Sequence, residues 1–347
     1  MNAEELAGQL LVVGYPGVQP PVELAQRLAL GHRAGVVLFK RNIPEDLLQL
    51  PELIAKLAPS DSSYPALVAV DQEGGRVMRI RAMALPVPAA AKVAARGAEF
   101  VERVAYAQSL ELRALGFTMN FAPVLDVHTE PSNPVIGDRA FGTTPEEVVQ
   151  LAGAWARGMR RADMLSCGKH FPGHGDTTVD SHLALPRVPH AFERLSDVEL
   201  LPFTALCEQV DALMSAHVVY EGWDPGVPAT LSYNICTFML RKGLGFHGVL
   251  FSDDLEMKAL SGDIEGNAIR AVLAGCDQLL ICSNEEWAER AHAALIREVE
   301  TSDAFRARVE VAVARSLMMR RRVAPHPNLA QFRHLVSEHE ALTKELS

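Results

Sequence analysis

The sequence lacks any apolar run long enough to cross a membrane. A helical span needs about 20 consecutive apolar residues, and the apolar runs of this chain are all shorter. The N-terminal segment MNAEELAGQLLVVGYPG carries Glu4 and Glu5 and has no Lys or Arg ahead of its short apolar stretch, so it does not show the pattern of a secretion signal. We therefore predict a cytoplasmic protein with no membrane partner.

Positive charge is also scarce. The formal net charge is −10, from 33 Lys and Arg against 43 Asp and Glu. The one dense basic run, Arg320, Arg321 and Arg322, falls in a late helical pattern and is interpreted as a solvated helix face or a helix C-terminus. Without a basic stripe, the sequence predicts no nucleic-acid partner.

Cysteines are few and show no paired spacing. The chain has five, Cys167, Cys207, Cys236, Cys276 and Cys282. An odd number without the spacings of a disulfide framework suits a reducing compartment. We expect all five to be buried thiols.

What the chain does have is a regular alternation of short apolar runs and amphipathic segments. The apolar runs predict strands covered on both faces, as in a parallel sheet. They occupy residues 10–14, 35–39, 66–71, 117–121, 165–170, 212–217, 248–253 and 277–282. Between them, segments such as Phe100–Leu115 and Pro145–Ala162 repeat apolar residues every three to four positions, as helices do.

This alternation predicts the α/β class and, more narrowly, a (β/α)8 TIM barrel. No G-x-G-x-x-G follows the first strand, which argues against a dinucleotide-binding sheet. Eight β/α units fit residues 1–285 as one catalytic barrel. Residues 286–347 are predicted to form extra C-terminal helices that pack on the barrel or extend from it, without a second catalytic domain.

Polar segments follow five of the predicted strands. They are DQEGGRVMR, APVLDV, KHFPGHGDTTVDSH, HVVY and DDLEM. In a barrel of parallel strands these segments meet at the C-terminal face, where TIM-barrel enzymes place their active sites. The sequence therefore predicts one polar site at this rim.

Asp253 ends an apolar strand and is expected to face the barrel mouth. A carboxylate there can serve as a metal ligand, a general base or a nucleophile. Alternatively, it caps the next helix, which we expect to begin near Leu255. For its neighbour Asp254, helix capping is the favoured interpretation.

Asp180 and His182 lie two residues apart in the long polar loop. A carboxylate bonded to an imidazole fixes its tautomer and brings its titration close to neutral pH, which suits a general acid/base. The alternative is a set of polar contacts that only hold the loop. Pro172, Gly173 and Gly175 make the segment rich in turns, so it could move when substrate binds.

Other fixed hydrogen-bonding groups are predicted at the same rim, and a polyhydroxylated ligand needs such groups. They are Asp71, Arg79, Arg139, Lys169 and His170. For Arg139, an ion pair with Asp138 or another rim acid is the alternative. For Asp126, a contact that holds its loop and a contact to a ligand both stay open.

The loop also contains residue types that bind metals. They are His170, His174, Asp176, Asp180 and His182. A helical histidine pair of the H-E-x-x-H kind is excluded, because Pro172 and the adjacent glycines prevent a helix. We predict no metal and keep a zinc-dependent hydrolase as the alternative.

Four motifs resemble glycoside hydrolase family 3, and within it the bacterial β-N-acetylglucosaminidases (β-N-acetylhexosaminidases) of cell-wall recycling. The motifs are VDQEGGRV at 70–77, NFAPVLDV at 120–127, KHFPGHGDTTVDSH at 169–182 and GVLFSDDLEM at 248–257. The similarity runs in order from about residue 5 to 285, and the long loop motif is the most specific. Members of the family have a (β/α)8 barrel, in agreement with the strand count.

The resemblance implies roles for individual residues. Asp253 matches the catalytic nucleophile, His182 the general acid/base, and Asp180 its partner. The sugar-binding positions are matched by Asp71, Arg79, Arg139, Lys169, His170 and His174.

The implied enzyme is an exo-acting, retaining β-N-acetylglucosaminidase that needs no cofactor. It would release terminal N-acetylglucosamine from muropeptide fragments by double displacement through a glycosyl-aspartate. Its partner would be a small carbohydrate or muropeptide substrate, and the chain a monomer or weak homo-oligomer. The alternatives are a β-glucosidase or a phosphorylase of the same family, and a non-catalytic sugar-binding barrel.

Overall fold

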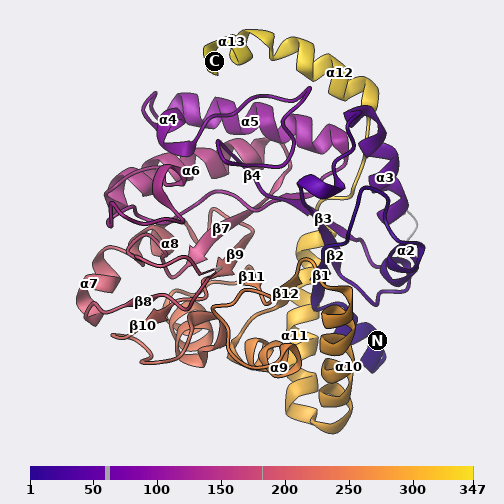
Figure 1. Ribbon diagram of the computed structural model, residues 1–347, viewed down its shortest axis with the longest axis vertical. Coiled ribbons are helices and arrows are strands. Elements are labelled where there is room, and N and C mark those ends of the chain that lie inside the picture. The colour runs from indigo at the N-terminus through magenta and orange to yellow at the C-terminus, as the bar shows by residue number, and fades with distance from the viewer. Residues whose placement is uncertain (59–62, 182, 347) are drawn as a thin grey trace.

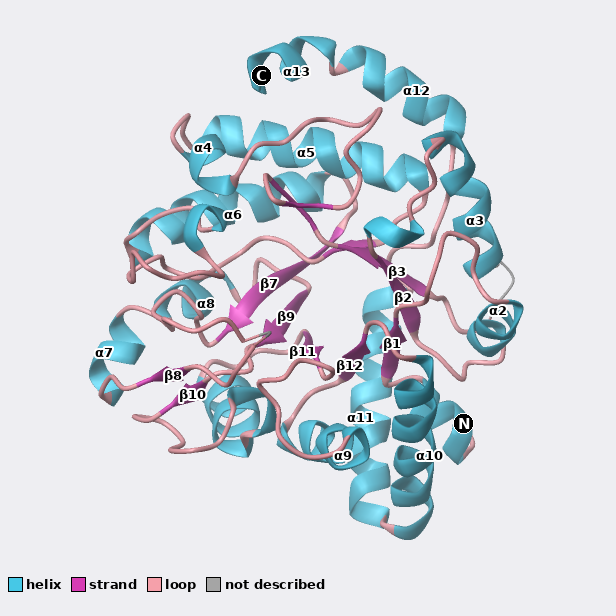
Figure 2. Ribbon diagram, viewed as in Figure 1, coloured by secondary structure: helices cyan, strands magenta, loops and turns pink. Residues whose placement is uncertain are grey.

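The computed structural model describes residues 1–58, 63–181 and 183–346 and is built around a closed barrel of eight parallel strands (Figures 1 and 2). The order around the barrel is β1-β12-β11-β9-β7-β6-β3-β2. The strands are β1 (Leu11–Val13), β2 (Gly35–Leu38), β3 (Leu67–Val70), β6 (Met119–Asn120), β7 (Leu165–Phe171), β9 (Ala212–Ser215), β11 (Val249–Asp254) and β12 (Gln278–Ile281). Each overlaps one of the eight predicted runs, so the (β/α)8 prediction is confirmed.

Helices cover the outside of this barrel (Figure 2). The α-helices are α1 (Ala3–Gly8), α2 (Val22–Ala29), α3 (Leu50–Leu57), α4 (Ala90–Ala94), α5 (Ala98–Leu115), α6 (Pro145–Arg161), α7 (Phe192–Asp197), α8 (Leu201–Leu206), α9 (Ile264–Ala274), α10 (Glu285–Thr301), α11 (Asp303–Arg320), α12 (Leu329–Glu338) and α13 (Glu340–Leu346). The short 3₁₀ turns are η1 (Lys40–Asn42), η2 (Leu47–Gln49), η3 (Gly137–Arg139) and η4 (Ala229–Leu231), and η5 (Asn234–Gly243) is a π-helix. α5 and α6 match the two helices predicted from apolar spacing. No helix in the described ranges is both long and apolar enough to span a membrane.

The alternation of side chains along each strand decides which residues reach the mouth. Successive strand residues point into the barrel and out toward the helices in turn. In β11, Val249 and Phe251 belong to the cluster that fills the barrel, whereas Leu250 packs in the outer layer between strands and helices. The next residue in the inward series is Asp253, so the polar end of this series faces the mouth.

Two other strands repeat this arrangement. In β3, Ala69 lies inside the barrel and Asp71 follows it in the inward series. In β7, Cys167 lies inside and Lys169 follows. Three strands therefore deliver a charged side chain to the same opening, each one step beyond its last inward apolar residue.

A small hairpin carries further polar residues over this opening. Strands β4 (Gln72–Gly74) and β5 (Val77–Met78) pair antiparallel directly after β3. Gly74 and Gly75, with φ of +110° and +56°, make the turn in a region that side chains disfavour. The Gln72 side chain accepts from the backbone N–H of Arg79 at 2.8 Å, which fixes the far end of the hairpin. A second two-stranded sheet pairs β8 (Arg187–Val188) with β10 (Val219–Tyr220).

The helices after residue 285 form two groups (Figure 1). α10 packs against α1 and α9, and α11 packs against α10, whereas α12 lies along α5. The boundary at residue 285 between a barrel and its C-terminal helices stays a prediction.

The basic run at the end of α11 differs from the prediction at its first residue. Arg320 is 2% exposed and donates to the carbonyls of Ala34 at 2.8 Å and Pro65 at 2.7 Å, just before β2 and β3. Burial lowers the pKa of its guanidinium to about 9. The interpretation as a solvated face was wrong for Arg320, because this end of α11 lies against the starts of barrel strands. Arg321 and Arg322 are exposed.

The cysteine prediction is confirmed. All five are free thiols, and all five are buried.

Candidate active site

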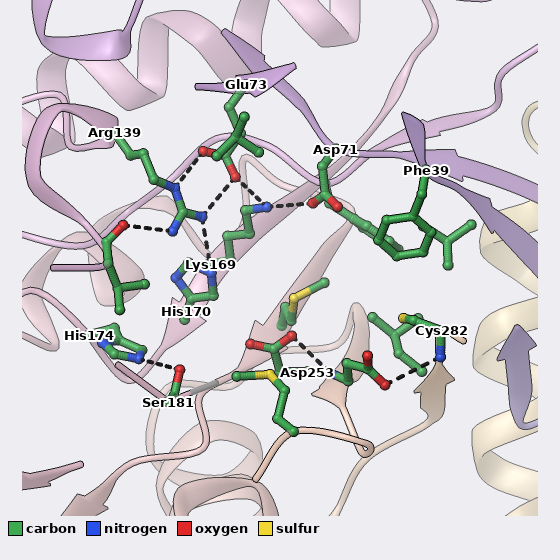
Figure 3. A pocket seen from close by; sticks show the side chains of 18 of the residues that line it. Phe39, Asp71, Glu73, Arg139, Lys169, His170, His174, Ser181, Asp253 and Cys282 are labelled. Carbon is green, nitrogen blue, oxygen red and sulfur yellow. Dashed lines mark hydrogen bonds and ion pairs between the residues drawn. The ribbon is translucent and has the colours of Figure 1, made fainter. Parts of the chain in front are cut away.

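A cavity of about 300 Å³ lies at the C-terminal end of the barrel (Figure 3). Seven of the nine predicted site residues line it: Asp71, Arg79, Arg139, Lys169, His170, His174 and Asp253. Asp180 belongs to the adjoining loop and is half-buried. His182 lies outside the described residues. The strand ends and the loops that follow them thus bring together side chains that are far apart in the sequence.

The Lys169 ammonium lies between two carboxylates. Its Nζ is 2.8 Å from Oδ1 of Asp71 and 2.6 Å from Oε1 of Glu73. Burial opposes the charge on Lys169, but the two carboxylates outweigh it and raise the pKa of the ammonium. The ammonium has three N–H groups, so these two bonds to described residues leave a third for a ligand in the cavity.

Asp71 is held by two cations. Its second carboxylate oxygen accepts from Nη2 of Arg79 at 3.0 Å. Burial of Asp71 opposes ionisation, yet Lys169 and Arg79 hold the pKa of its carboxyl well below its usual range. The side chains of Asp71 and Arg79 keep 15% and 26% of their surface exposed, so both can contact a ligand.

Glu73 is the important site residue that sequence analysis missed. It accepts two bonds from Arg139, from Nε at 2.8 Å and from Nη2 at 2.9 Å, in addition to the Lys169 contact. Burial opposes its ionisation, but the Arg139 and Lys169 charges lower the pKa of its carboxyl to about 2. Glu73 therefore fixes two predicted sugar-binding cations at once. The ion pair expected for Arg139 exists, with Glu73 as its acid.

His170 lies between the Glu73–Arg139–Lys169 cluster and Asp253 in Figure 3. Its Nδ1 is 2.7 Å from Oδ2 of Asp126, and a carboxylate can only accept, so Nδ1 carries the proton. Its Nε2 is directed to Nη2 of Arg139 at 3.4 Å. The ring is thus fixed from both sides, by Asp126 in the loop after β6 and by Arg139 in η3.

Asp126 is a structural residue. It is fully buried, and its Oδ1 accepts from the backbone N–H groups of His170 at 3.1 Å and His174 at 2.7 Å. Its second oxygen binds the His170 ring. Of the two interpretations left open for Asp126, the structure supports the contact that holds the loop.

The two adjacent carboxyls at the end of β11 lie in different electrostatic environments. For Asp253, burial opposes ionisation, but His217, His170, the backbone N–H of Asp254 and Lys169 lower the pKa below its usual range. For Asp254, burial and then the neighbouring Glu256 raise the pKa to about 7. Environments that separate two carboxyls in this way assign them different roles. Asp253 is the ionised carboxylate, as a nucleophile must be.

Asp254 does not cap a helix, contrary to the prediction. Its Oδ1 accepts from the backbone N–H of Glu256 at 3.1 Å and of Cys282 at 3.3 Å. The next helix, α9, begins only at Ile264 and is capped by Asp263. The prediction failed because turns occupy the residues between, and Asp254 instead ties β11 to the end of β12.

His174 lines the cavity, but both of its ring nitrogens bind protein groups. Nδ1 is 2.9 Å from Oγ1 of Thr177, and Nε2 is 3.1 Å from Oγ of Ser181. Burial and the nearby His170 lower the pKa of the ring to about 4. Its role as a sugar ligand stays a prediction.

Within residues 1–58, 63–181 and 183–346, no three His, Cys, Asp or Glu side chains are grouped so that they could hold a metal ion. Two carboxylates of the cavity, those of Asp71 and Glu73, are bound by Lys and Arg instead. An ionised carboxylate facing fixed donors across a small cavity suits nucleophilic attack on a polyhydroxylated molecule.

Comparison with known proteins gives concordant results. A family model described as the glycosyl hydrolase family 3 N-terminal domain matches residues 3–319. A beta-hexosaminidase of Methylococcus capsulatus is 43% identical over 280 residues, which cover 78% of this chain and 82% of that protein.

Solved structures agree. A family 3 β-N-acetylglucosaminidase from Paenibacillus sp. str. FPU-7 is 37% identical, with a TM-score of 0.88 over 97% of this chain and 68% of that one. Native NagZ from Neisseria gonorrhoeae is 30% identical, with a TM-score of 0.75 over 89% of this chain and 98% of that one. The chain therefore belongs to glycosyl hydrolase family 3 and is a glycoside hydrolase, as its motifs predict.

Proposed function

We propose that this glycoside hydrolase is an exo-acting, retaining β-N-acetylglucosaminidase. The observation that carries the proposal is Asp253, an ionised carboxylate at the mouth of the barrel, facing a cavity lined by Lys169, Arg139 and Arg79. The cavity of about 300 Å³ lies at the lower end of the range for small-ligand sites, which favours recognition of one terminal sugar. The N-acetyl preference is supported by relatives named beta-hexosaminidase and β-N-acetylglucosaminidase.

The proposed reaction is a double displacement. Asp253 attacks the anomeric carbon, the glycosidic C–O bond breaks, and the leaving oxygen takes a proton from protonated His182. Neutral His182 then removes a proton from water, which attacks the same carbon and releases Asp253 from the glycosyl ester. Two inversions give net retention of configuration. Asp180 is proposed to orient and charge the His182 imidazole.

The sugar is proposed to be held by Asp71, Arg79, Arg139, Lys169 and His170, with His174 nearby. Lys169, Arg139 and His170 are fixed by Glu73 and Asp126 through the contacts described above. Because these groups are oriented before substrate binds, little ordering cost falls on the binding step. No cofactor takes part in this chemistry.

The natural substrate is proposed to be a muropeptide fragment with a terminal N-acetylglucosamine, cleaved in the cytoplasm. The resemblance to cell-wall recycling enzymes and the similarity to NagZ support the substrate, and five buried free thiols suit a reducing compartment. The chain is proposed to act as a monomer or weak homo-oligomer, without a nucleic-acid or membrane partner.

The proposal is tested by initial rates on 4-nitrophenyl β-N-acetylglucosaminide and 4-nitrophenyl β-glucoside, with the anomer of the first product followed by NMR. We expect kcat/KM to favour the acetamido sugar by about 10²-fold or more, since a site built for a polar group rejects an analogue without it. The β-anomer should form first. A preference for the glucoside, or release of the α-anomer first, would overturn the proposal.

Three further measurements with the same substrates separate the alternatives. Glycosyl phosphate formed in phosphate buffer would identify a phosphorylase, and sugar affinity without turnover would identify a binding protein. Loss of activity on chelation and its return with zinc would identify a metal-dependent hydrolase.

A further inference from the structure

The loop that carries Asp180 has a deeply buried residue with exposed residues to either side of it in the sequence. Thr178, Val179, Leu183 and Ala184 are exposed. Ser181 is only 2% exposed and lines the active-site cavity. A serine at such a position marks the point where the stretch is attached to the barrel.

The Ser181 hydroxyl is bound to His174. The distance between Oγ of Ser181 and Nε2 of His174 is 3.1 Å, and His174 is itself 1% exposed (Figure 3). The backbone N–H of His174 donates to Oδ1 of Asp126 at 2.7 Å. A fully buried carboxylate thus holds His174, and His174 holds Ser181.

The direction of these hydrogen bonds follows from donor and acceptor counts. The Thr177 hydroxyl donates its only proton to the His174 carbonyl at 3.1 Å, so its oxygen accepts from Nδ1 of the ring. The proton of the neutral ring is then on Nδ1, and Nε2 carries a lone pair. Ser181 is therefore the donor to Nε2. The lowered pKa of His174 agrees with a neutral ring.

We propose that the His174–Ser181 hydrogen bond is a latch that positions Asp180, the proposed carboxylate partner of the proton donor. Ser181 directly follows Asp180 in the chain, so a fixed Ser181 limits where the Asp180 carboxylate can lie. His174 and Ser181 are positioning residues in this proposal. It replaces the predicted sugar contact of His174 with a role through the loop, since both ring nitrogens bind protein groups. This inference rests on the proposed function, because it takes Asp180 and His182 as the acid/base pair.

Loss of the latch should slow a substrate more strongly when its leaving oxygen needs a proton to depart. A 2,4-dinitrophenolate leaves as a stable anion, whereas a 4-methoxyphenolate needs protonation as the C–O bond breaks. General acid catalysis contributes typically 10²–10⁴-fold, and a poorly placed acid loses part of that factor. A residue with a merely structural role would lower both rates equally.

The experiment compares kcat/KM for these two aryl β-N-acetylglucosaminides in the full-length protein. For Ser181→Ala we expect a loss of about 10- to 100-fold on the 4-methoxyphenyl substrate and at most about a twofold loss on the dinitrophenyl substrate. Ser132→Ala is the matched control, since its exposed hydroxyl binds Glu130 on the neighbouring loop. It should leave both values unchanged.

A second pair of variants tests the partner. Gln in place of His174 can present an acceptor near the position of Nε2, whereas Leu cannot. His174→Gln should therefore keep more activity on the 4-methoxyphenyl substrate than His174→Leu, at similar activity on the dinitrophenyl substrate.

His182→Asn separates the two possible failures. If this variant shows the selective loss and Ser181→Ala does not, or if Ser181→Ala slows both substrates equally, the latch is wrong and the acid/base assignment stands. If His182→Asn shows no selective loss, the acid/base assignment itself has failed, and the latch fails with it.

Discussion

The barrel has a buried cluster of ion pairs at each end, and the two clusters serve different purposes. At the mouth, Asp71 and Glu73 bind Lys169, Arg79 and Arg139. At the opposite end, Asp277 lies just before β12. Its carboxylate accepts from three arginines, Arg241 at 2.6 Å, Arg308 at 3.0 Å and Arg315 at 2.8 Å.

The clusters differ in what the cations do with their remaining N–H groups. At the end opposite the mouth, Arg241 donates to the carbonyls of Phe246 and Gly248. Arg308 donates to the carbonyls of Val272 and Cys276. These arginines join strand starts to helices. At the mouth, the cations line a cavity and can still donate to a ligand.

The comparison shows that buried ion pairs alone do not identify a site. The position relative to the strand direction does, because catalytic groups of TIM barrels lie at the carboxyl ends of strands and the opposite face contributes to stability.

Replacement of the proposed nucleophile should produce the largest effect. Asp253→Asn is nearly isosteric but cannot form the glycosyl ester, so we expect kcat to fall by roughly 10⁴-fold or more. The urea unfolding midpoint should stay near that of the wild type. A variant that turns over as fast as the wild type would remove Asp253 from the chemistry.

Replacement of Asp277, the carboxylate at the end opposite the mouth, should lower stability instead of activity. Asp277→Asn leaves three arginines around a neutral group, which should lower the free energy of unfolding by about 3–5 kcal/mol, measured by urea denaturation. At a temperature where the variant is folded, its kcat/KM should stay within about twofold of wild type. Asp277 lies at the face of the barrel that contributes to stability, away from the active site. A selective loss of kcat/KM in the folded variant would contradict the division between the two ends.

Glu73→Gln should lower activity by a smaller factor than Asp253→Asn. The amide keeps the shape but removes the charge that holds Lys169 and Arg139, and a misplacement of about 1 Å can cost about 10²-fold in kcat/KM. KM should rise as kcat falls, because both binding groups lose their orientation.

Glu111→Gln is the matched control for Glu73→Gln. Glu111 is a buried carboxylate of α5 that binds the backbone N–H of Leu85 and the ring of His339, outside the cavity. Its replacement should leave kcat/KM close to wild type. Equal losses in the two variants would assign Glu73 a purely structural role.

The smallest effect expected is on the pH dependence of stability. The pKa of Glu73 is lowered to about 2 in the folded protein, against roughly 4.3 in an unfolded chain. As pH falls between these values, the unfolded chain binds a proton first, so the stability due to ionised Glu73 is present above about pH 4.3 and is lost toward pH 2. The difference in unfolding free energy between wild type and Glu73→Gln should therefore shrink over this window. A difference that stays constant with pH would show that Glu73 is not an ionised partner in the folded state.

The sequence predicted the barrel and the ends of its strands because both follow from local periodicity. The inward orientation of Asp253 follows from the alternation of side chains along Val249, Leu250 and Phe251, because every second residue of a strand points into the barrel. The same holds for Asp71 and Lys169. Their convergence follows from the parallel direction of the strands.

Partner identity could not be predicted in the same way. Glu73 lies in a hairpin outside the barrel strands, and its contact with Arg139 depends on how that hairpin folds over the mouth. Asp254 was misassigned as a helix cap and Arg320 as part of a solvated helix face, because sequence patterns describe neighbours along the chain. Their actual partners, Cys282 and Ala34, come from distant segments.

The proposed mechanism requires a covalent glycosyl-aspartate at Asp253, at the mouth of the barrel. The most direct test is incubation of the enzyme with an activated 5-fluoro N-acetylglucosaminyl fluoride, followed by intact-mass and peptide mass spectrometry. We expect a mass increase of one fluorinated sugar per chain, located on the peptide that contains Asp253 and absent in Asp253→Asn. An adduct on another residue would contradict the proposed mechanism. So would an active enzyme that turns over the reagent without any adduct and releases the α-anomer.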